Sequence, residues 1–307
     1  MRPDLLRSPS ISQRSDVSPF IVMDVMSEAA AIERSGGTIV HMEVGQPGHP
    51  APKAALAAAE AAIRSGRVPY TEALGIRSLR ERIARHYGEK YDVALPAERV
   101  VVTTGSSGAF TLAFLAMFEP GARVAISAPG YPAYRNILKA LSLEAVEIPT
   151  GPETRYALTG DLIRKAHADK PLQGVLAMSP ANPTGIVMTP AALQALCETC
   201  RALGLWFISD EIYHGLTYGD AQEETALRFS DDAVIINSFS KFFCMTGWRV
   251  GWMVVPERLV RPIERLQQNF SISVPYLSQV AAEAAFDGSE EMEAVKAGYA
   301  RNRAILI

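Results

Sequence analysis

The sequence predicts an α/β fold in which helices cover a largely parallel β-sheet. From Arg99 onward, short runs rich in β-branched residues alternate with polar or glycine turns and with helical stretches. This alternation is typical of βαβ units, which build parallel sheets. The chain has 307 residues, which is enough to bury a large core in one domain or in two.

The N-terminal third precedes this repeating pattern. Residues 1–19 contain three prolines and are expected to form a loose arm, and the apolar spacing that follows predicts a helix from about Phe20 to Arg34. The run TIVHMEVGQPGHP predicts a short strand that enters a Gly/Pro turn. The alanine-rich run KAALAAAEAAIRSG predicts a second helix, because Pro52 suits a first turn and Gly66 suits the position after the last turn.

The repeating part predicts both the sheet and the position of a site. Helices are expected notably at 109–118, 132–141 and 190–203, and strands at 100–103, 123–127, 174–179, 205–209, 233–237 and 249–255. In open α/β sheets, ligands bind outside the carboxyl ends of the strands. The polar residues directly after each strand are therefore the candidate site residues.

The composition excludes several classes of function. Hydrophobic residues make up 48% and charged residues 21% of the chain, and the formal net charge is −3. A chain of this charge has no general attraction for nucleic acid or an anionic membrane surface. The sequence has no run of 18 apolar residues and no secretory signal pattern, so we expect a cytoplasmic protein. The five histidines do not occur at metal-ligand spacing.

The three cysteines indicate a reducing compartment, because an odd number in a long chain does not suggest a disulfide framework. Cys197 and Cys200 form a C-x-x-C within a helical stretch. No second pair completes a zinc site, so we favour helix packing for this pair over metal binding or redox chemistry.

Two turns that follow strands suggest binding of a planar, phosphorylated ligand. The turn at 105–108 in TTGSSGAFTLAF leads into a helix, where free backbone N–H groups and the dipole favour a phosphate. Glycine and serine also occur in such turns for conformational reasons alone. Tyr131, between Gly130 and Pro132, either presents its ring to a planar ligand or packs on the sheet edge.

Two further strand ends carry an amide and a carboxylate. Asn182 in SPANPTG either belongs to a simple loop or offers its amide to a ring oxygen. Asp210 follows an apolar strand, and a carboxylate there is costly unless it meets a cation or hydrogen-bond donors. A protonated pyridine nitrogen would be such a cation. Tyr213 lies three residues later, within reach of the same pocket.

Lys241 lies between an apolar strand and the apolar run FFCM. Partial desolvation of its ammonium would lower its pKa and favour imine chemistry. Arg249, eight residues later, supplies a fixed positive charge that suits a phosphate.

The stretch SFSKFFCMTGWRVG resembles the cofactor-lysine signature of class I/II aminotransferases, in the aspartate aminotransferase superfamily of fold type I. VGQP, YTEALGIRSLR, TTGSSGA, PGYPAY, NPTG and SDEIY also occur in the family's order, and the resemblance runs from about Val17 to Phe286. It implies a three-layer αβα large domain with a mainly parallel mixed sheet, plus a small α+β domain. The implied divisions are 1–44 (arm and part of the small domain), 45–275 (cofactor-binding domain) and 276–307 (start of an incomplete C-terminal small domain).

The resemblance implies that the cofactor is pyridoxal 5′-phosphate. Lys241 would bind it as a Schiff base and would be catalytic together with Asp210 and Tyr213. Asp210 would pair with the pyridinium nitrogen, Tyr213 and Asn182 would contact the ring hydroxyl oxygen, and Tyr131 would stack on the ring.

The resemblance also assigns phosphate and substrate contacts. The positions that match the phosphate site are Gly105, Ser106, Ser107, Ser238, Ser240 and Arg249. Tyr70 would reach the phosphate in the neighbouring subunit, which implies a homodimer. Gly45 and Asn182 would contact the amino-acid or 2-oxo-acid substrate.

Two positions depart from the family pattern. Cys244 stands where serine or another small residue is expected. The chain stops at Ile307, whereas family members continue through a C-terminal small domain that carries the arginine for the substrate α-carboxylate, so we expect a truncated sequence.

The expected activity is transamination between an L-amino acid and a 2-oxo acid. A β-lyase, decarboxylase or synthase reaction on the same cofactor is the alternative, because a fold does not fix its reaction. An aminotransferase-like sensor domain would follow a basic DNA-binding module, and the short N-terminal arm and negative net charge disfavour it. The sequence leaves the amino donor open among aspartate, alanine, aromatic and branched-chain substrates.

Overall fold

The computed structural model describes residues 9–307, which form one seven-stranded sheet in the order β1-β7-β6-β5-β4-β2-β3. The strands are β1 (Val100–Thr103), β2 (Arg123–Ala128), β3 (Glu144–Pro149), β4 (Gly174–Met178), β5 (Trp206–Asp210), β6 (Val234–Ser238) and β7 (Gly251–Val254). All neighbours pair in parallel except β7, which runs antiparallel to β1 and β6. The predicted mainly parallel mixed sheet is confirmed.

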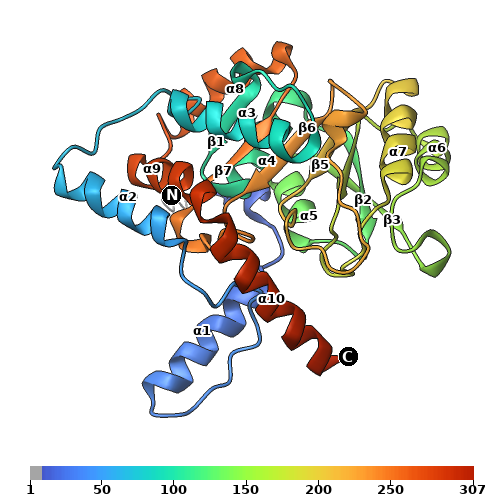
Figure 1. The fold of residues 1–307 in the computed structure, drawn as a ribbon. Helices are drawn as coiled ribbons and strands as arrows, with labels where there is room; N and C mark the ends of the chain where they lie inside the picture. Colours follow the sequence, from blue (N-terminus) through green and yellow to red (C-terminus); the bar gives the residue numbers. More distant parts are fainter. Residues whose placement is uncertain (1–8) are drawn as a thin grey trace, which may run out of the picture.

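Helices cover both faces of this sheet (Figure 1). They are α1 (Ile21–Arg34), α2 (Lys53–Arg64), α3 (Arg77–Tyr91), α4 (Gly105–Met117), α5 (Pro132–Ala140), α6 (Gly160–Asp169), α7 (Pro190–Ala202), α8 (Glu257–Phe270), α9 (Tyr276–Ala285) and α10 (Ser289–Leu306). Successive residues of a strand point to opposite faces, and in β6 Ile235 joins one apolar cluster while Val234 and Ile236 join the other. The first cluster includes residues of α2, α3, α7 and α9, and the second includes residues of α4, α5 and α8.

The N-terminal third contains one wrong prediction. The helix expected from about Phe20 to Arg34 is confirmed, and Gly66 has a φ of +68° just after α2. The strand expected in TIVHMEVGQPGHP does not form, because residues 38–47 pair with no strand of the described chain. Val40 and Met42 are 83% and 84% exposed, so these apolar residues bury no surface that would fix them in a sheet.

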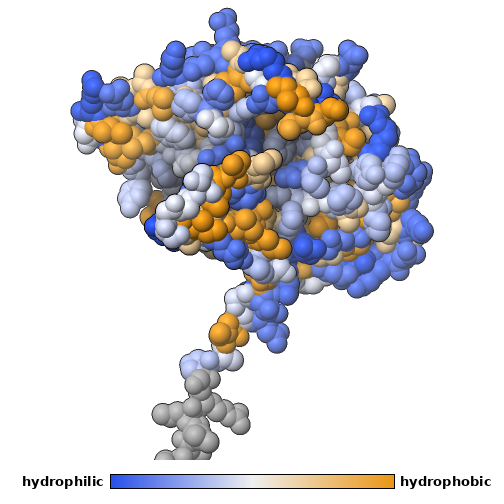
Figure 2. All heavy atoms as spheres, turned by 90° about the horizontal axis from the view of Figure 1, so that it is seen from below, coloured by the Kyte–Doolittle hydropathy of each residue, from blue (hydrophilic) through white to orange (hydrophobic). Residues whose placement is uncertain are grey.

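Two helices extend away from the sheet. Figure 1 shows α1 and α10 projecting below the body of the molecule. Of the described residues of α1, only Ala29 is buried. Figure 2 views the face toward which both helices point, and apolar side chains gather near its centre. No described helix has the length and apolar character needed to cross a membrane.

Candidate active site

A cavity of about 340 Å³ lies at the carboxyl ends of the central strands. Asp210 ends β5, Asn182 follows β4, Tyr131 follows β2, and Lys241 follows β6. The predicted site residues that line it are Gly45, Ser106, Tyr131, Asn182, Asp210, Tyr213 and Lys241. Loops distant in sequence therefore meet at one cavity, as the strand-end rule predicts.

Lys241 extends across the cavity toward the N-terminal segment. Its Nζ donates a hydrogen bond of 2.8 Å to the carbonyl oxygen of Gly45 and lies 5.7 Å from the centre of the Tyr213 ring. Burial lowers the pKa of Lys241, the charge of Arg249 lowers it further, and Asp210 opposes both effects. A lowered pKa increases the fraction of neutral amine, which is the nucleophilic form.

Asp210 is a buried carboxylate, 2% exposed, at the floor of the cavity. Burial raises its pKa to about 6, against hydrogen bonds from Tyr134 and the backbone of Ile212 and the charge of Lys241, which lower it. The Tyr134 hydroxyl donates to Oδ2, and the Ile212 N–H donates to Oδ1 at 3.1 Å. A cation placed against this carboxylate would favour its charged form.

Tyr134 is a site residue that the sequence interpretation missed. It lies three residues after Tyr131 at the start of α5, and residues at this spacing share one face of a helix. The spacing in PGYPAY was thus a usable signal.

Aromatic and amide side chains form one wall of the cavity. The Tyr131 ring packs edge-on against Phe20 and Tyr134, with centroids 5.9 and 5.3 Å apart. Asn182 Nδ2 donates to the Tyr213 hydroxyl at 3.5 Å. Tyr131 can therefore flank a flat ring, while Asn182 and Tyr213 present a donor pair to an oxygen on its edge.

The start of α4 meets the Arg249 guanidinium. Gly105 has a φ of +74°, and a Cβ there would lie 2.5 Å from Nη2 of Arg249. Arg249 Nη1 donates to the Thr246 carbonyl oxygen at 3.1 Å, which orients the guanidinium. A helix N-terminus and a guanidinium at one point form a site for a phosphate.

The predicted serines differ in their surroundings. Ser106 lines the cavity, and Ser107 follows it in the first turn of α4. Ser238 and Ser240 are buried and do not line the cavity; their hydroxyl oxygens lie 2.9 Å apart, and Ser238 also donates to the Val250 carbonyl oxygen. Their hydroxyls already have partners in this arrangement.

Three other sequence features lie outside the cavity. Tyr70 is 78% exposed, and Cys244 lies near Tyr299 of α10, with Sγ 4.0 Å from the hydroxyl oxygen. Cys197 and Cys200 are free and buried, and burial raises the pKa of each thiol to about 12. Protonated, buried thiols support the packing interpretation of the C-x-x-C.

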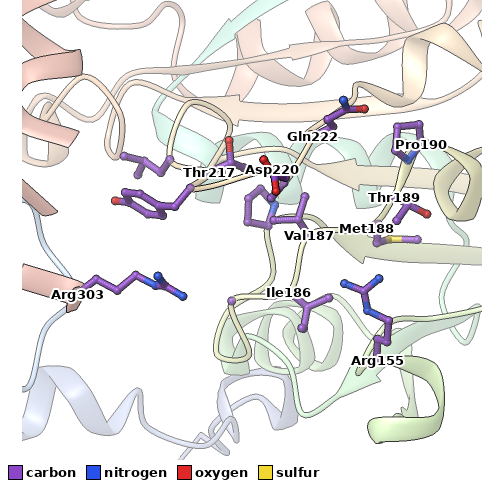
Figure 3. A pocket seen from close by; sticks show the side chains of 15 residues that line it. Arg155, Ile186, Val187, Met188, Thr189, Pro190, Thr217, Asp220, Gln222 and Arg303 are labelled. Carbon is purple, nitrogen blue, oxygen red and sulfur yellow. The ribbon is translucent and has the colours of Figure 1, made fainter. Parts of the chain in front are cut away.

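A second cavity, of about 570 Å³, is lined by the loops after β4 and β5. Figure 3 shows Arg155 and Arg303 reaching toward it from opposite sides. None of the described residues that line it is a predicted site residue. We therefore assign the chemistry to the smaller cavity, where Lys241 and Asp210 meet.

The smaller cavity fits a flat, phosphorylated aldehyde whose ring nitrogen can be protonated. It offers an amine for the aldehyde, a carboxylate for the nitrogen, an amide–phenol pair for a ring oxygen and a cradle for the phosphate. Together with the α/β sheet, this set suits a group-transfer enzyme that works through an organic cofactor.

The family model described as aminotransferase class I and II matches residues 38–307, and the chain belongs to this family. It is a transaminase, which moves an amino group between an amino acid and a 2-oxo acid. Members of this family generally depend on pyridoxal phosphate.

Individual relatives agree with this assignment. The chain is 47% identical over 300 residues to a valine–pyruvate aminotransferase of Mycobacterium tuberculosis, covering 97% of this chain and 77% of that protein. A crystal structure of an aminotransferase from the same organism superposes with a TM-score of 0.94, at 47% identity, over 97% of this chain and 78% of that one. The structure of the aspartate aminotransferase from Thermus thermophilus with maleate superposes with a TM-score of 0.92 at 26% identity, over 97% of this chain and 79% of that chain.

Proposed function

We propose that this transaminase uses pyridoxal 5′-phosphate, bound covalently to Lys241 in the cavity of about 340 Å³. The observation that carries the proposal is the meeting of Lys241 and Asp210 with Tyr131, Asn182 and Tyr213 around that one cavity. Five side chains from four separate strand ends would then surround one ligand.

The bound cofactor supplies an electron sink for the electron pair left when the donor's Cα–H bond breaks. Asp210 holds a proton on the ring nitrogen through its carboxylate, and Tyr134 and the Ile212 N–H fix the position of that carboxylate. Arg249 and the start of α4 anchor the phosphate, which keeps the ring at a fixed angle to Lys241.

Lys241 would act as the proton carrier once the donor's amine has replaced Nζ on the cofactor. Its lowered pKa favours a neutral Nζ, which would accept the proton from Cα of the amino donor. Gly45, whose carbonyl oxygen contacts Nζ at 2.8 Å, lies beside the place where the donor's Cα must enter. Substrate contact by Gly45 and Asn182 is part of this proposal.

We propose an apolar amino acid such as valine as donor and pyruvate as acceptor, by likeness to the valine–pyruvate relative. The division at 1–44, 45–275 and 276–307 remains part of the proposal, with the middle segment binding the cofactor. The three free cysteines support a reducing compartment such as the cytoplasm.

We also propose a homodimer in which Tyr70 reaches the partner's phosphate site. Tyr70 is 78% exposed, and Phe270 and Ile272 are 61% and 52% exposed. Thr71 donates its N–H to the Ser273 hydroxyl at 3.3 Å, which holds these two segments together. Exposed apolar groups on adjoining segments suit a protein interface.

Borohydride reduction tests the central claim. Reduction of the cofactor-loaded protein, followed by digestion and mass spectrometry, should place a pyridoxyl group on the peptide that contains Lys241. Lys241→Ala should remove this modification, and Lys170→Ala, which changes an exposed lysine, should retain it. A pyridoxyl group on another lysine in the wild-type protein would contradict the assignment.

A further inference from the structure

Two glutamine side chains of the described chain are buried, Gln267 of α8 and Gln279 of α9, which are 1% and 0% exposed. A buried amide costs free energy unless its donors and its acceptor find partners. Both amides bind the same short segment, residues 71–76, which lies between Tyr70 and α3. Because a satisfied network of buried hydrogen bonds makes its members rigid, the two amides fix the position of this segment.

Gln279 binds both ends of the segment. Its Oε1 accepts a hydrogen bond of 2.7 Å from the Ile76 N–H, and its Nε2 donates to the Thr71 hydroxyl oxygen at 2.9 Å. The same Nε2 donates to the Val274 carbonyl oxygen at 2.9 Å, just before α9 begins. The acceptor and both donors of this amide are therefore used. The fit is close, since a Cβ on Gly75 would lie 3.1 Å from Oε1.

Gln267 holds the middle of the segment against the edge strand β1. Its Nε2 donates to the carbonyl oxygens of Ala73 and Val102, the latter at 2.9 Å. The Val102 N–H donates to the Leu74 carbonyl oxygen at 2.9 Å. The outer backbone groups of an edge strand need partners from outside the sheet, and these contacts supply them at Val102. The segment is thus fixed to the strand that leads into the Gly105 turn.

We propose that Gln279 is a positioning residue that directs Tyr70 toward the phosphate site of the partner subunit. This inference rests on the proposed function, in which Tyr70 makes that contact. Tyr70 is 78% exposed, so packing within its own subunit does little to hold its side chain. The next residue, Thr71, is bound from two sides, by the Ser273 hydroxyl and by Gln279. A backbone fixed in advance lowers the entropy cost of the contact that Tyr70 makes.

The affinities of the full chain for pyridoxal 5′-phosphate and for pyridoxal, which lacks the phosphate, test this role. Fluorescence titration gives both dissociation constants. The ratio of the pyridoxal constant to the pyridoxal 5′-phosphate constant is the phosphate preference. Tyr70→Phe should lower the phosphate preference by about tenfold, the effect of one lost hydrogen bond to a charged group. Gln279→Leu should lower it by at least about threefold, because Tyr70 is then present but no longer held in position.

A double variant distinguishes positioning from a merely structural role. Gln279→Leu combined with Tyr70→Phe should have the phosphate preference of Tyr70→Phe alone, within about twofold, because Gln279 acts through Tyr70. A merely structural role would instead weaken the binding of both ligands alike, or would lower the phosphate preference further in the double variant.

Milder variants keep the test valid if Gln279→Leu does not fold. Thr71→Val removes the hydroxyl that Gln279 binds and should lower the phosphate preference by about threefold. Thr71→Ser keeps a hydroxyl and should retain the wild-type value within about twofold. Thr199→Val is the control for lost stability, because its buried hydroxyl binds Arg164 and the Ala195 carbonyl oxygen. It should leave the phosphate preference unchanged.

Three outcomes overturn the inference. They are an unchanged phosphate preference in Gln279→Leu or Thr71→Val, an equal loss in Thr71→Val and Thr71→Ser, and losses that multiply in the double variant. An unchanged preference in Tyr70→Phe also overturns it, because Gln279 would then position a residue that makes no phosphate contact. Failure of the proposed cofactor attachment would instead appear as a missing pyridoxyl group on Lys241, which the reduction experiment measures separately.

Discussion

Glu211, the residue after Asp210, is a buried acid that the proposed reaction does not use. It is 1% exposed, and Oε1 accepts hydrogen bonds from Ser209, Thr225 and the Ala226 N–H. Oε2 has no hydrogen-bond partner among the described residues. Burial raises the pKa of Glu211 to about 8, so it is largely protonated at pH 7.

His214 approaches the free oxygen without forming an ion pair. Its Nδ1 lies 3.6 Å from Oε2 of Glu211, and burial lowers the pKa of His214 to about 4. Nδ1 is instead 2.6 Å from the Tyr91 hydroxyl. Both Glu211 and His214 are therefore neutral at pH 7, and their approach is not a salt bridge.

The raised pKa of Glu211 predicts a pH-dependent stability. The native state holds a proton that the unfolded carboxyl, with its ordinary pKa of 4.5, releases. The free energy of unfolding therefore falls as pH rises from 4.5 to 8, by about 2 kcal/mol between pH 6 and pH 8. Glu211→Gln should remove this loss, because the amide does not titrate.

Denaturant unfolding of the cofactor-free protein at pH 6 and pH 8 measures this effect. The difference between wild type and Glu211→Gln cancels the contributions of His214 and Asp210. If the two proteins differ in free energy of unfolding by the same amount at pH 6 and at pH 8, the raised pKa is not that of Glu211.

Tyr134 should control the charge of Asp210. Its hydroxyl donates to Oδ2 and lowers the pKa of this carboxyl. In Tyr134→Phe the pKa should rise by up to about one unit, since one hydrogen bond to a charged group is lost. Because the proposed function requires ionised Asp210 to bind the cofactor, cofactor affinity should then begin to decline at a higher pH than in wild type as the pH is lowered.

Absorbance titration of cofactor binding between pH 5 and pH 8 measures this shift. Tyr87→Phe is a matched control, because the Tyr87 hydroxyl binds Trp252 rather than Asp210. If cofactor affinity declines at the same pH in Tyr134→Phe as in wild type, Tyr134 does not control the charge of Asp210.

At the scale of elements, Gly105 at the start of α4 has a left-handed backbone conformation and lies against the Arg249 guanidinium. Gly105→Ala should lose about 1 kcal/mol of stability, because alanine is strained at a φ of +74°. The added Cβ would also displace the Arg249 guanidinium from 2.5 Å away. Cofactor affinity should therefore fall at least about tenfold, the loss expected when a charge-assisted phosphate contact is disturbed.

Gly121→Ala separates strain from the phosphate site. Gly121 has a φ of +84°, and a Cβ there would meet no atom within 4 Å. Gly121→Ala should lower the free energy of unfolding by about as much as Gly105→Ala does, and should keep the wild-type cofactor affinity. Equal affinity losses in both variants would assign the effect to strain. Thermal unfolding and fluorescence titration of the cofactor provide the two measurements.

The same scale shows how far the sequence predicts the structure. The buried central strands were found within two residues, because their apolar runs are continuous and turns bound them. The edge strand β3 (EAVEIP) was not predicted, since it is largely exposed and carries a glutamate on each face, Glu144 and Glu147. Residues 38–47 show a strand-like pattern but have no partner strand, and a local pattern does not contain that information.

The cavity lining was predictable where a residue ends or directly follows a strand. Lys241, Asp210, Asn182 and Tyr131 all lie at such positions, and the fold brings them together. Glu43 and Phe20 line the same cavity but come from the N-terminal segments. Their approach to the sheet depends on packing between distant parts of the chain, which local spacing does not reveal.

At the scale of the whole molecule, the proposed dimer predicts complementation between two inactive variants. Each site would use its own Lys241 and the partner's Tyr70, so Lys241→Ala and a disruptive Tyr70→Ala should each be nearly inactive. Half of the dimers in an equal, fully exchanged mixture pair the two variants, and each has one intact site. Activity should therefore recover to about a quarter of wild type.

Sedimentation in the ultracentrifuge checks that the mixture is dimeric, and native mass spectrometry checks that the subunits have exchanged. Activity of the mixture that stays at the mean of the two separate variants, despite a confirmed dimer, would place Tyr70 outside the partner's site. Mixing Lys241→Ala with Asp210→Ala is the negative control, because both residues belong to the same subunit's site.

The weak attachment of α1 has an evolutionary consequence. This helix buries only Ala29 among its described residues, yet its first residues and the segment after it supply Phe20, Val22 and Glu43 to the cavity. Substitutions there can alter the substrate range at little cost to the core. Descendants of one ancestral chain could therefore come to use new amino donors without first evolving a more stable fold.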